Sequence, residues 1–130
     1  MSFDEISLTL PANHAFHRVA HLVLGGLAIR LDLTFENLED LELALDALLE
    51  RTGNEHDVTL RVRVLDGALQ TVIGPFTSVR AELERGGEDS LNLRRILATV
   101  CDAVDITDHD GSQWVELTKR VDTTRRGTGG

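Results

Sequence analysis

The amino-acid sequence predicts an α+β fold, a two-layer α/β sandwich in which helices cover one face of a mixed, mostly antiparallel sheet. Apolar and polar residues alternate in residues 6–10 and 58–64, which is the period of a strand with one buried face. In residues 16–31 and 38–49 the apolar residues recur every three or four positions, the period of an amphipathic helix. Asp66-Gly67 is the strongest hairpin signal. The predicted order of elements is β-α-α-β-β-α-α-β-β.

The N-terminal part predicts one strand and one helix. The strand ends at Pro11, which cannot continue a ladder of backbone hydrogen bonds. The helix runs from Asn13, whose side chain can cap the first turn, to Leu31. Gly25-Gly26 lies in the middle of this helix, where each glycine costs about 1 kcal/mol relative to alanine. We therefore expect another backbone to pack closely against the helix at this point.

The second predicted helix begins after Thr34, a favourable N-cap residue, and ends near Gly53. Its apolar stripe and its acidic stripe run side by side. The apolar stripe consists of Leu38, Leu41, Leu45, Leu48 and Leu49, and the acidic stripe consists of Glu39, Glu42, Asp46 and Glu50. The acidic stripe is either a solvated helix face or a surface for a basic partner.

The second half of the sequence predicts a hairpin, two helices and a closing pair of strands. These elements are strands at Val58–Val64 and Leu69–Ile73, with Pro75 closing the second, helices at Thr77–Glu84 and Leu91–Ala103, and strands at Val104–Thr107 and Gln113–Val121. We expect one domain over residues 1–121. Residues 122–130 are polar and rich in glycine, so we expect a disordered tail there.

Composition and charge exclude several classes of function. The 130 residues carry 13 basic and 22 acidic side chains, a formal net charge of −9, so we expect no direct binding of nucleic acid, which requires a basic face. The single cysteine, Cys101, excludes a disulfide framework and a zinc site built on cysteines. No apolar run approaches the ~20 residues of a membrane span, and residues 1–5 lack the features of a signal peptide. We expect a cytoplasmic protein that binds no membrane.

Two further features remain open to more than one interpretation. His14, His17 and His21 share one face of the first helix, at spacings that could hold Zn²⁺ or respond to pH. No carboxylate at matching spacing completes a tetrahedral site, so we interpret the histidines as part of a polar outer face and predict no metal site. Trp114, near the start of the last strand, is either a core residue or an anchor for a protein interface.

Three segments carry a resemblance to a known family: residues 25–30 (GGLAIR), residues 36–41 (ENLEDL) and residues 114–119 (WVELTK). They resemble the small anti-sigma regulatory factors of the histidine-kinase-like (GHKL, or Bergerat-fold) ATPase superfamily, and the likeness covers about residues 5–121. The resemblance implies a homodimer that binds a sigma factor and an anti-anti-sigma (STAS) protein. Active members use ATP and Mg²⁺ to phosphorylate a serine of the STAS partner.

The nucleotide site of that family consists of three boxes, and the first places a Glu and an Asn four residues apart on the second helix. There the carboxylate acts as general base and the amide oxygen binds Mg²⁺. The resemblance puts Ala47 and Arg51 at these positions, and neither residue can take the role. An alternative pair, Glu50 as catalytic base and Asn54 as cofactor ligand, has the right spacing, but Gly53 lies between the two.

The second and third boxes also depart from the family pattern. The second box, in which an Asp binds the adenine amino group before two glycines, is replaced by residues 73–77 (IGPFT), with Pro75 at the Asp position. The third box, a glycine-containing turn that cradles phosphates at a helix N-terminus, is replaced by residues 90–95 (SLNLRR). Three independent departures predict a domain that keeps the fold, binds no nucleotide cofactor and has no catalytic residue.

The resemblance further implies that an arginine of the first helix contacts the partner. The local sequence pattern places this residue at Arg18, whereas an ungapped alignment places it at His21. We therefore expect an anti-sigma-like regulator of transcription that works by binding a partner. The alternatives are an active ATP-dependent serine-protein kinase using Glu50 and Asn54, and a non-catalytic accessory subunit that pairs with a complete paralogue.

Overall fold

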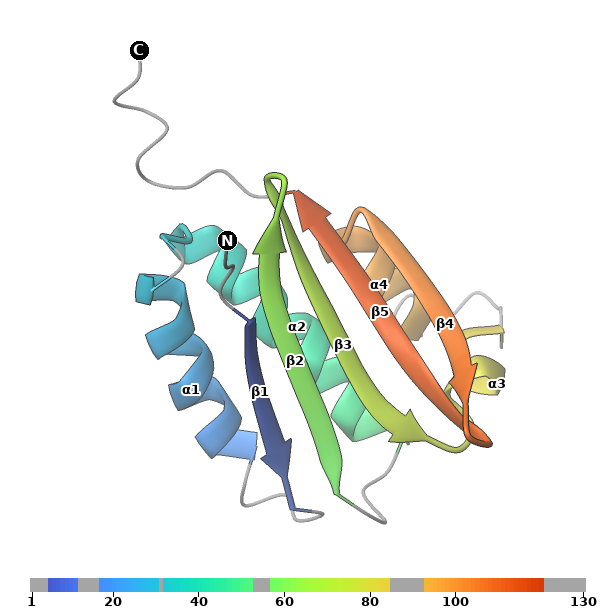
Figure 1. Cartoon of the computed structure of the whole chain (residues 1–130). Coiled ribbons are helices and arrows are strands. Elements are labelled where there is room, and N and C mark those ends of the chain that lie inside the picture. The colour runs from blue at the N-terminus through green and yellow to red at the C-terminus, as the bar shows by residue number, and fades with distance from the viewer. Residues whose placement is uncertain (1–4, 12–16, 31, 53–56, 85–92, 121–130) are drawn as a thin grey trace.

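The structure, a computed structural model, describes residues 5–11, 17–30, 32–52, 57–84 and 93–120. In this part of the chain the elements are β1 (Glu5–Leu10), α1 (His17–Arg30), α2 (Phe35–Thr52), β2 (Val58–Leu65), β3 (Ala68–Phe76), α3 (Val79–Glu84), α4 (Leu93–Val100), β4 (Ala103–His109) and β5 (Ser112–Arg120). Helices α1, α2 and α4 lie behind the sheet and leave its other face open (Figure 1). The predicted α+β fold, with helices on one face of the sheet, is confirmed.

The five strands form one sheet in the order β1-β2-β3-β5-β4, and every neighbouring pair is antiparallel. Strand β3 is therefore central, and β1 and β4 are the two edges. The turns that join β2 to β3 and β4 to β5 each have an aspartate followed by a glycine at positive φ, 56° and 76° at Asp66-Gly67 and 55° and 80° at Asp110-Gly111. Two successive residues at positive φ suit the tight turn of a hairpin. The predicted hairpin at Asp66-Gly67 is confirmed.

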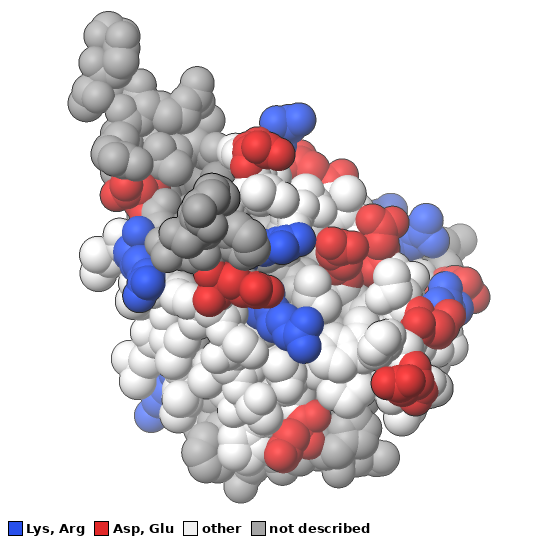
Figure 2. Space-filling view, viewed as in Figure 1, with Lys and Arg blue, Asp and Glu red and all other residues white. Residues whose placement is uncertain are grey.

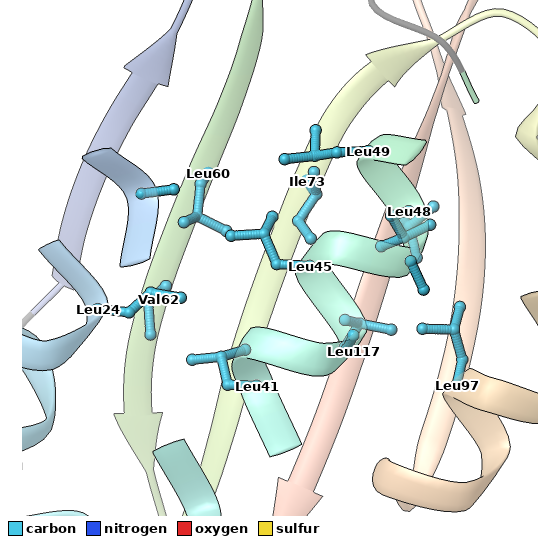
Figure 3. Packing of buried hydrophobic residues seen from close by; sticks show 14 of the residues in the cluster. Leu24, Leu41, Leu45, Leu48, Leu49, Leu60, Val62, Ile73, Leu97 and Leu117 are labelled. Carbon is cyan, nitrogen blue, oxygen red and sulfur yellow. The ribbon is translucent and has the colours of Figure 1, made fainter. Parts of the chain in front are cut away.

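Helix α2 forms the middle of the helical layer. Thr34 caps it as predicted, because its Oγ1 accepts a hydrogen bond of 3.1 Å from the backbone N–H of Asn37. The buried leucines of α2 point toward the sheet, as Figure 3 shows for Leu41, Leu45, Leu48 and Leu49. Leu24 of α1 and Leu97 of α4 extend the same cluster on the two sides of α2. The core therefore lies between α2 and the central strands.

Several boundaries differ from the prediction, and pairing with β5 explains two of them. Strand β3 continues through Pro75 to Phe76, because Phe76 pairs with Gln113 of β5 beyond an irregularity in the register. Helix α4 ends at Val100, earlier than predicted, because Ala103 already pairs with Thr118 in the sheet. In both places pairing with β5, which is distant in sequence from β3, decides where the element ends.

Some predictions fall outside the residues that the structure describes. These are the cap at Asn13, the helix stop at Gly53 and the disordered tail at residues 122–130. Among the described residues, no helix is both long enough and apolar enough to cross a membrane.

Candidate functional site

The outward face of α1 carries apolar side chains. Leu22 is 73% exposed, Ile29 is 81% exposed and Val19 is 39% exposed. Together with Gly26 they lie three, four and three positions apart and so share one side of the helix; we call Val19, Leu22, Gly26 and Ile29 the α1 stripe. The other side of α1 buries a second apolar set, Ala20, Leu24 and Leu27. The sequence-based interpretation missed the stripe. A signal was present, because Leu22 and Ile29 are apolar residues that lie outside the predicted core positions of this helix.

Gly25 and Gly26 do not have the close backbone neighbour that the sequence predicts. Among the described residues, a Cβ built on either glycine would meet nothing within 4 Å outside its own stretch of helix. The prediction of close packing at this point is therefore wrong for the described part of the chain. Gly26 instead lies exposed in the middle of the α1 stripe, where it leaves the helix surface free of a side chain.

The two partner-binding candidates on α1 have different surroundings. The Nε2 of His21 lies 2.8 Å from Oδ1 of Asp46, and its Nδ1 lies 3.5 Å from Oε2 of Glu42. Both carboxylates belong to α2, so the half-buried imidazole connects the two helices. Arg18 is exposed beside the first residue of the α1 stripe. His21 thus faces α2, and Arg18 is accessible to a partner.

The positions that the resemblance assigns to the first nucleotide box lie on α2 or next to it. Ala47 is 7% exposed and lies among the core residues, and its methyl group can neither accept a proton nor hold a metal ion. Glu50, the alternative catalytic base, is exposed near the end of the helix. Its proposed companion Asn54 lies outside the described residues, as does the side chain of Arg51. The pairing of Glu50 with Asn54 therefore stays a prediction.

The positions that the resemblance assigns to the second and third boxes lie near the end of β3 and the start of α4. Pro75 follows Gly74 through a cis peptide, and its ring offers no carboxylate to an adenine amino group. Phe76, at 2% exposure, belongs to the hydrophobic core. At the start of α4, Leu93 is buried and Arg94 is exposed, and residues 90–92 lie outside the described part of the chain.

A cavity of about 540 Å³ lies between α3, α4 and the edge strand β4. Its polar lining includes Arg80, Arg94 and Asp105, and neither Ala47 nor Pro75 lines it. Cys101 also lines the cavity, and burial raises the pKa of its thiol to about 11. The thiol is therefore protonated at neutral pH and is not an activated nucleophile.

Comparisons with known proteins point to one family. No family model matches the chain. Its sequence is 23% identical over 147 residues to the Serine-protein kinase RsbW of Bacillus velezensis, a match that covers 95% of this chain and 90% of that protein. Among solved structures, the chain resembles the RsbU and RsbW domains of a protein from Mycobacterium tuberculosis, with a TM-score of 0.67, 15% sequence identity and 91% of this chain covered. The chain spans 32% of the length of that solved chain.

The solved structure supports the fold, and the sequence match to RsbW extends over nearly the whole of both proteins. The structural likeness, with its TM-score of 0.67, extends over 91% of this chain and so includes most of the five-stranded sheet and its helical layer. The chain therefore resembles the Serine-protein kinase RsbW in sequence, and its fold resembles that of the solved RsbU and RsbW domains.

Proposed function

We propose that this chain is an anti-sigma-like regulator of transcription that binds a sigma factor, an anti-anti-sigma (STAS) protein or both, through the outward face of α1. The observation that carries the proposal is the α1 stripe, which exposes Leu22 at 73% and Ile29 at 81% to solvent beside the accessible Arg18. Exposed apolar side chains gathered on one face are typical of protein interaction sites. We further propose that the protein acts in the cytoplasm and as a homodimer.

Arg18 is the residue of α1 that we propose contacts the partner. Its guanidinium can donate several hydrogen bonds in a fixed geometry and suits a carboxylate at the rim of an apolar contact. His21 is already engaged by Asp46 at 2.8 Å, so its contribution to partner binding is to hold α1 in place. The stripe supplies the affinity, and Arg18 supplies orientation.

We also propose that the protein neither binds nor hydrolyses ATP. The supporting observations are the buried Ala47 at the position of the family's general base and Pro75 at the position of its adenine-binding Asp. Without phosphoryl transfer, release of one partner depends on competition by another partner. Regulation then follows the relative concentrations and affinities of the competing proteins.

Pull-down with the tagged full chain tests the partner. We expect mass spectrometry to identify a sigma factor or a STAS protein among the proteins recovered from the native host. We expect the Leu22→Glu and Arg18→Glu variants each to recover no more than about a tenth of the amount of partner that the wild type recovers. Leu43→Glu is the matched control, because Leu43 is 51% exposed on α2, away from the stripe. Recovery of neither protein class by the wild type contradicts the proposal, and recovery of a paralogous RsbW-like chain alone favours the accessory-subunit alternative.

Nucleotide titration tests the loss of ATP binding. We expect no change in the melting temperature with ATP, ADP or a non-hydrolysable analogue in the presence of Mg²⁺. A ligand at 100 times its dissociation constant stabilises the fold by about 2.7 kcal/mol, so binding would be readily detected. The B. velezensis RsbW, measured in parallel, is the positive control. A shift for this chain, with kinase activity lost in Glu50→Gln, would establish the kinase alternative instead.

A further inference from the structure

Strand β4 is an edge of the sheet with a cavity beside it. It pairs with β5 on one side, and among the described residues no backbone hydrogen bond joins its other side to another element. In Figure 1 it is the strand at the right, with α4 behind it and α3 near its lower end. An edge strand presents a row of backbone N–H and C=O groups that can pair with a further strand. Strand β4 is therefore a place where an extended segment can join the sheet.

The cavity of about 540 Å³ opens onto the backbone of β4. Four consecutive residues of the strand, 103–106, line it, although successive side chains of a strand point to opposite faces. The strand thus meets the cavity along its backbone edge. On the helical side the lining includes Leu83 of α3 and Leu97 and Ala98 of α4. A segment added here would lie between helices and an exposed sheet edge, where main-chain hydrogen bonds and side-chain pockets act together in peptide recognition.

The side chains of β4 that face the helical layer are apolar and incompletely covered. Val104 and Ile106 pack against the core but are only half-buried. Their register partners on β5, Leu117 and Val115, are buried. The cavity therefore leaves apolar surface of the edge strand in contact with water, and burial of such surface is favourable. We expect an added segment to supply apolar side chains at alternate positions, on the side that faces the helices.

On the open face of the sheet, the same edge is acidic. Asp105 is exposed and is the register partner of Glu116, and neither forms an ion pair among the described residues. Figure 2 shows acidic side chains over β4 and β5 at the right of the view. Like charges on directly paired residues destabilise a sheet. A lysine or arginine placed beside Asp105 by an added segment would relieve this repulsion.

The charges that line the cavity favour a basic segment as well. Arg80 is already paired with Asp108, whose Oδ2 lies 2.8 Å from its Nη2. Arg94 is exposed and forms no ion pair among the described residues. The carboxylates of the described lining outnumber this one cation; they are Glu84, Asp102 and Asp105.

Trp114 leaves this edge uncovered. Its neighbour Val115 is buried in the core, so Trp114 points to the open face and is not a residue of the core between sheet and helices. Its ring lies over Gly74 of β3, where a Cβ would come within 2.5 Å of the indole Cδ2. The ring thus covers the centre of the sheet. Thr107, the register partner of Trp114 on β4, is exposed, as is Asp105.

We propose that β4 binds an extended segment of another protein, which joins the sheet as a sixth strand and places apolar side chains in the cavity between β4, α3 and α4. The segment alternates apolar residues, which face the helices, with small or basic residues on the open face, and one basic residue lies beside Asp105. Strand β4 has 7 residues, so a segment of similar length, roughly 20 Å, occupies the edge. Helix α1 lies beside β1 at the opposite edge (Figure 1), so this site is separate from the α1 stripe.

Panning a phage library of random nine-residue peptides on the immobilised full chain tests the site. We expect the enriched peptides to alternate apolar and polar residues and to carry lysine or arginine at a polar position. A synthetic copy of one enriched peptide is then added to the full chain in solution. We expect the changes in amide NMR shifts to concentrate at residues 103–108, and hydrogen exchange to slow there, because backbone groups of the edge gain partners.

Ala98→Trp is the variant that fills the cavity. Ala98 is exposed on α4 and lines the cavity, so an indole there occupies the space without disturbing the core. We expect the dissociation constant of the peptide to rise at least tenfold, because the apolar side chains lose their place. Thr99→Trp is the matched control: Thr99 is the next residue, is also exposed and is not among the described residues of the lining. It should leave the dissociation constant unchanged.

Asp105→Lys reverses the charge beside the edge. A lysine opposite Glu116 is a favourable cross-strand pair, so the variant keeps the fold. We expect the dissociation constant of a peptide with a basic residue to rise about tenfold, and to recover when glutamate replaces that residue, because attraction becomes repulsion and then attraction again. Glu39→Lys, at an exposed position of α2, changes the net charge equally and should have no effect.

Four results would overturn the proposal. These are a library without enriched peptides, enriched peptides without alternation, NMR changes centred outside β4, and equal binding of the peptide by wild type and Ala98→Trp. The pull-down with the α1 variants is a separate measurement, so failure of the proposed function and failure of this site are told apart.

Discussion

Replacement of Leu45 by alanine is expected to lower the free energy of unfolding by about 2–5 kcal/mol. Leu45 is fully buried on α2, and Figure 3 shows its side chain between α2 and the strands that carry Leu60 and Ile73. Truncation leaves a cavity in a densely packed core beside β2 and β3. Urea unfolding, followed by circular dichroism at one fixed protein concentration, measures the loss as a lower midpoint with an unchanged slope.

Leu43→Ala is the matched control for this prediction. Leu43 lies on the same helix, only two residues before Leu45, but is 51% exposed. The helix propensity changes equally in both variants, so the difference between them reports burial alone. We expect Leu43→Ala to change the free energy of unfolding by no more than about 0.5 kcal/mol. Similar losses in the two variants would contradict the assigned orientation of α2.

Replacement of Gly74 by alanine is expected to lower the free energy of unfolding by about 1–3 kcal/mol. The added Cβ would lie 2.5 Å from Cδ2 and 2.9 Å from Cγ of Trp114, too close for non-bonded carbon atoms. Cγ is attached near the backbone, so the ring cannot avoid the contact by a small movement of its far end. Trp114 is the only tryptophan in the sequence, and its fluorescence spectrum therefore reports the displacement directly.

Gly26→Ala is a control for which we expect the free energy of unfolding to change in the opposite direction. Among the described residues nothing lies within 4 Å of a Cβ at this position, and the residue lies within α1. Alanine should therefore raise the free energy of unfolding by about 0.5–1 kcal/mol through its higher helix propensity.

Unchanged tryptophan fluorescence and stability in Gly74→Ala would show that Trp114 does not cover Gly74.

Local sequence patterns predicted most of the elements because their causes are local. Alternation in residues 58–64, the Asp66-Gly67 turn and the Thr34 cap each act within a few residues, and all three are confirmed. The identities of Ala47 and Pro75 are likewise properties of the sequence. They are the basis on which we propose a domain without nucleotide.

The two sides of α1 illustrate what sequence periodicity cannot decide. Leu24 is buried and Leu22 is 73% exposed, although both are leucines of one apolar helix. The helical period tells which residues share a side, but the side that packs is chosen by the layer beneath it. In the same way, only the approach of α2 shows that His21 meets Asp46 whereas Arg18 remains accessible.

The sequence by itself determined the order of the elements, the turns that join the hairpins and the residue types at positions 47 and 75, because each depends on neighbouring residues or on residue type alone. Only the tertiary structure decided that Trp114 lies outside the core and that Arg61, Val72, Glu116 and Asp105 form one row. Such a row joins residues up to 55 positions apart, from Arg61 to Glu116. Its register is set by the simultaneous packing of the whole sheet on the helices, which no local pattern contains.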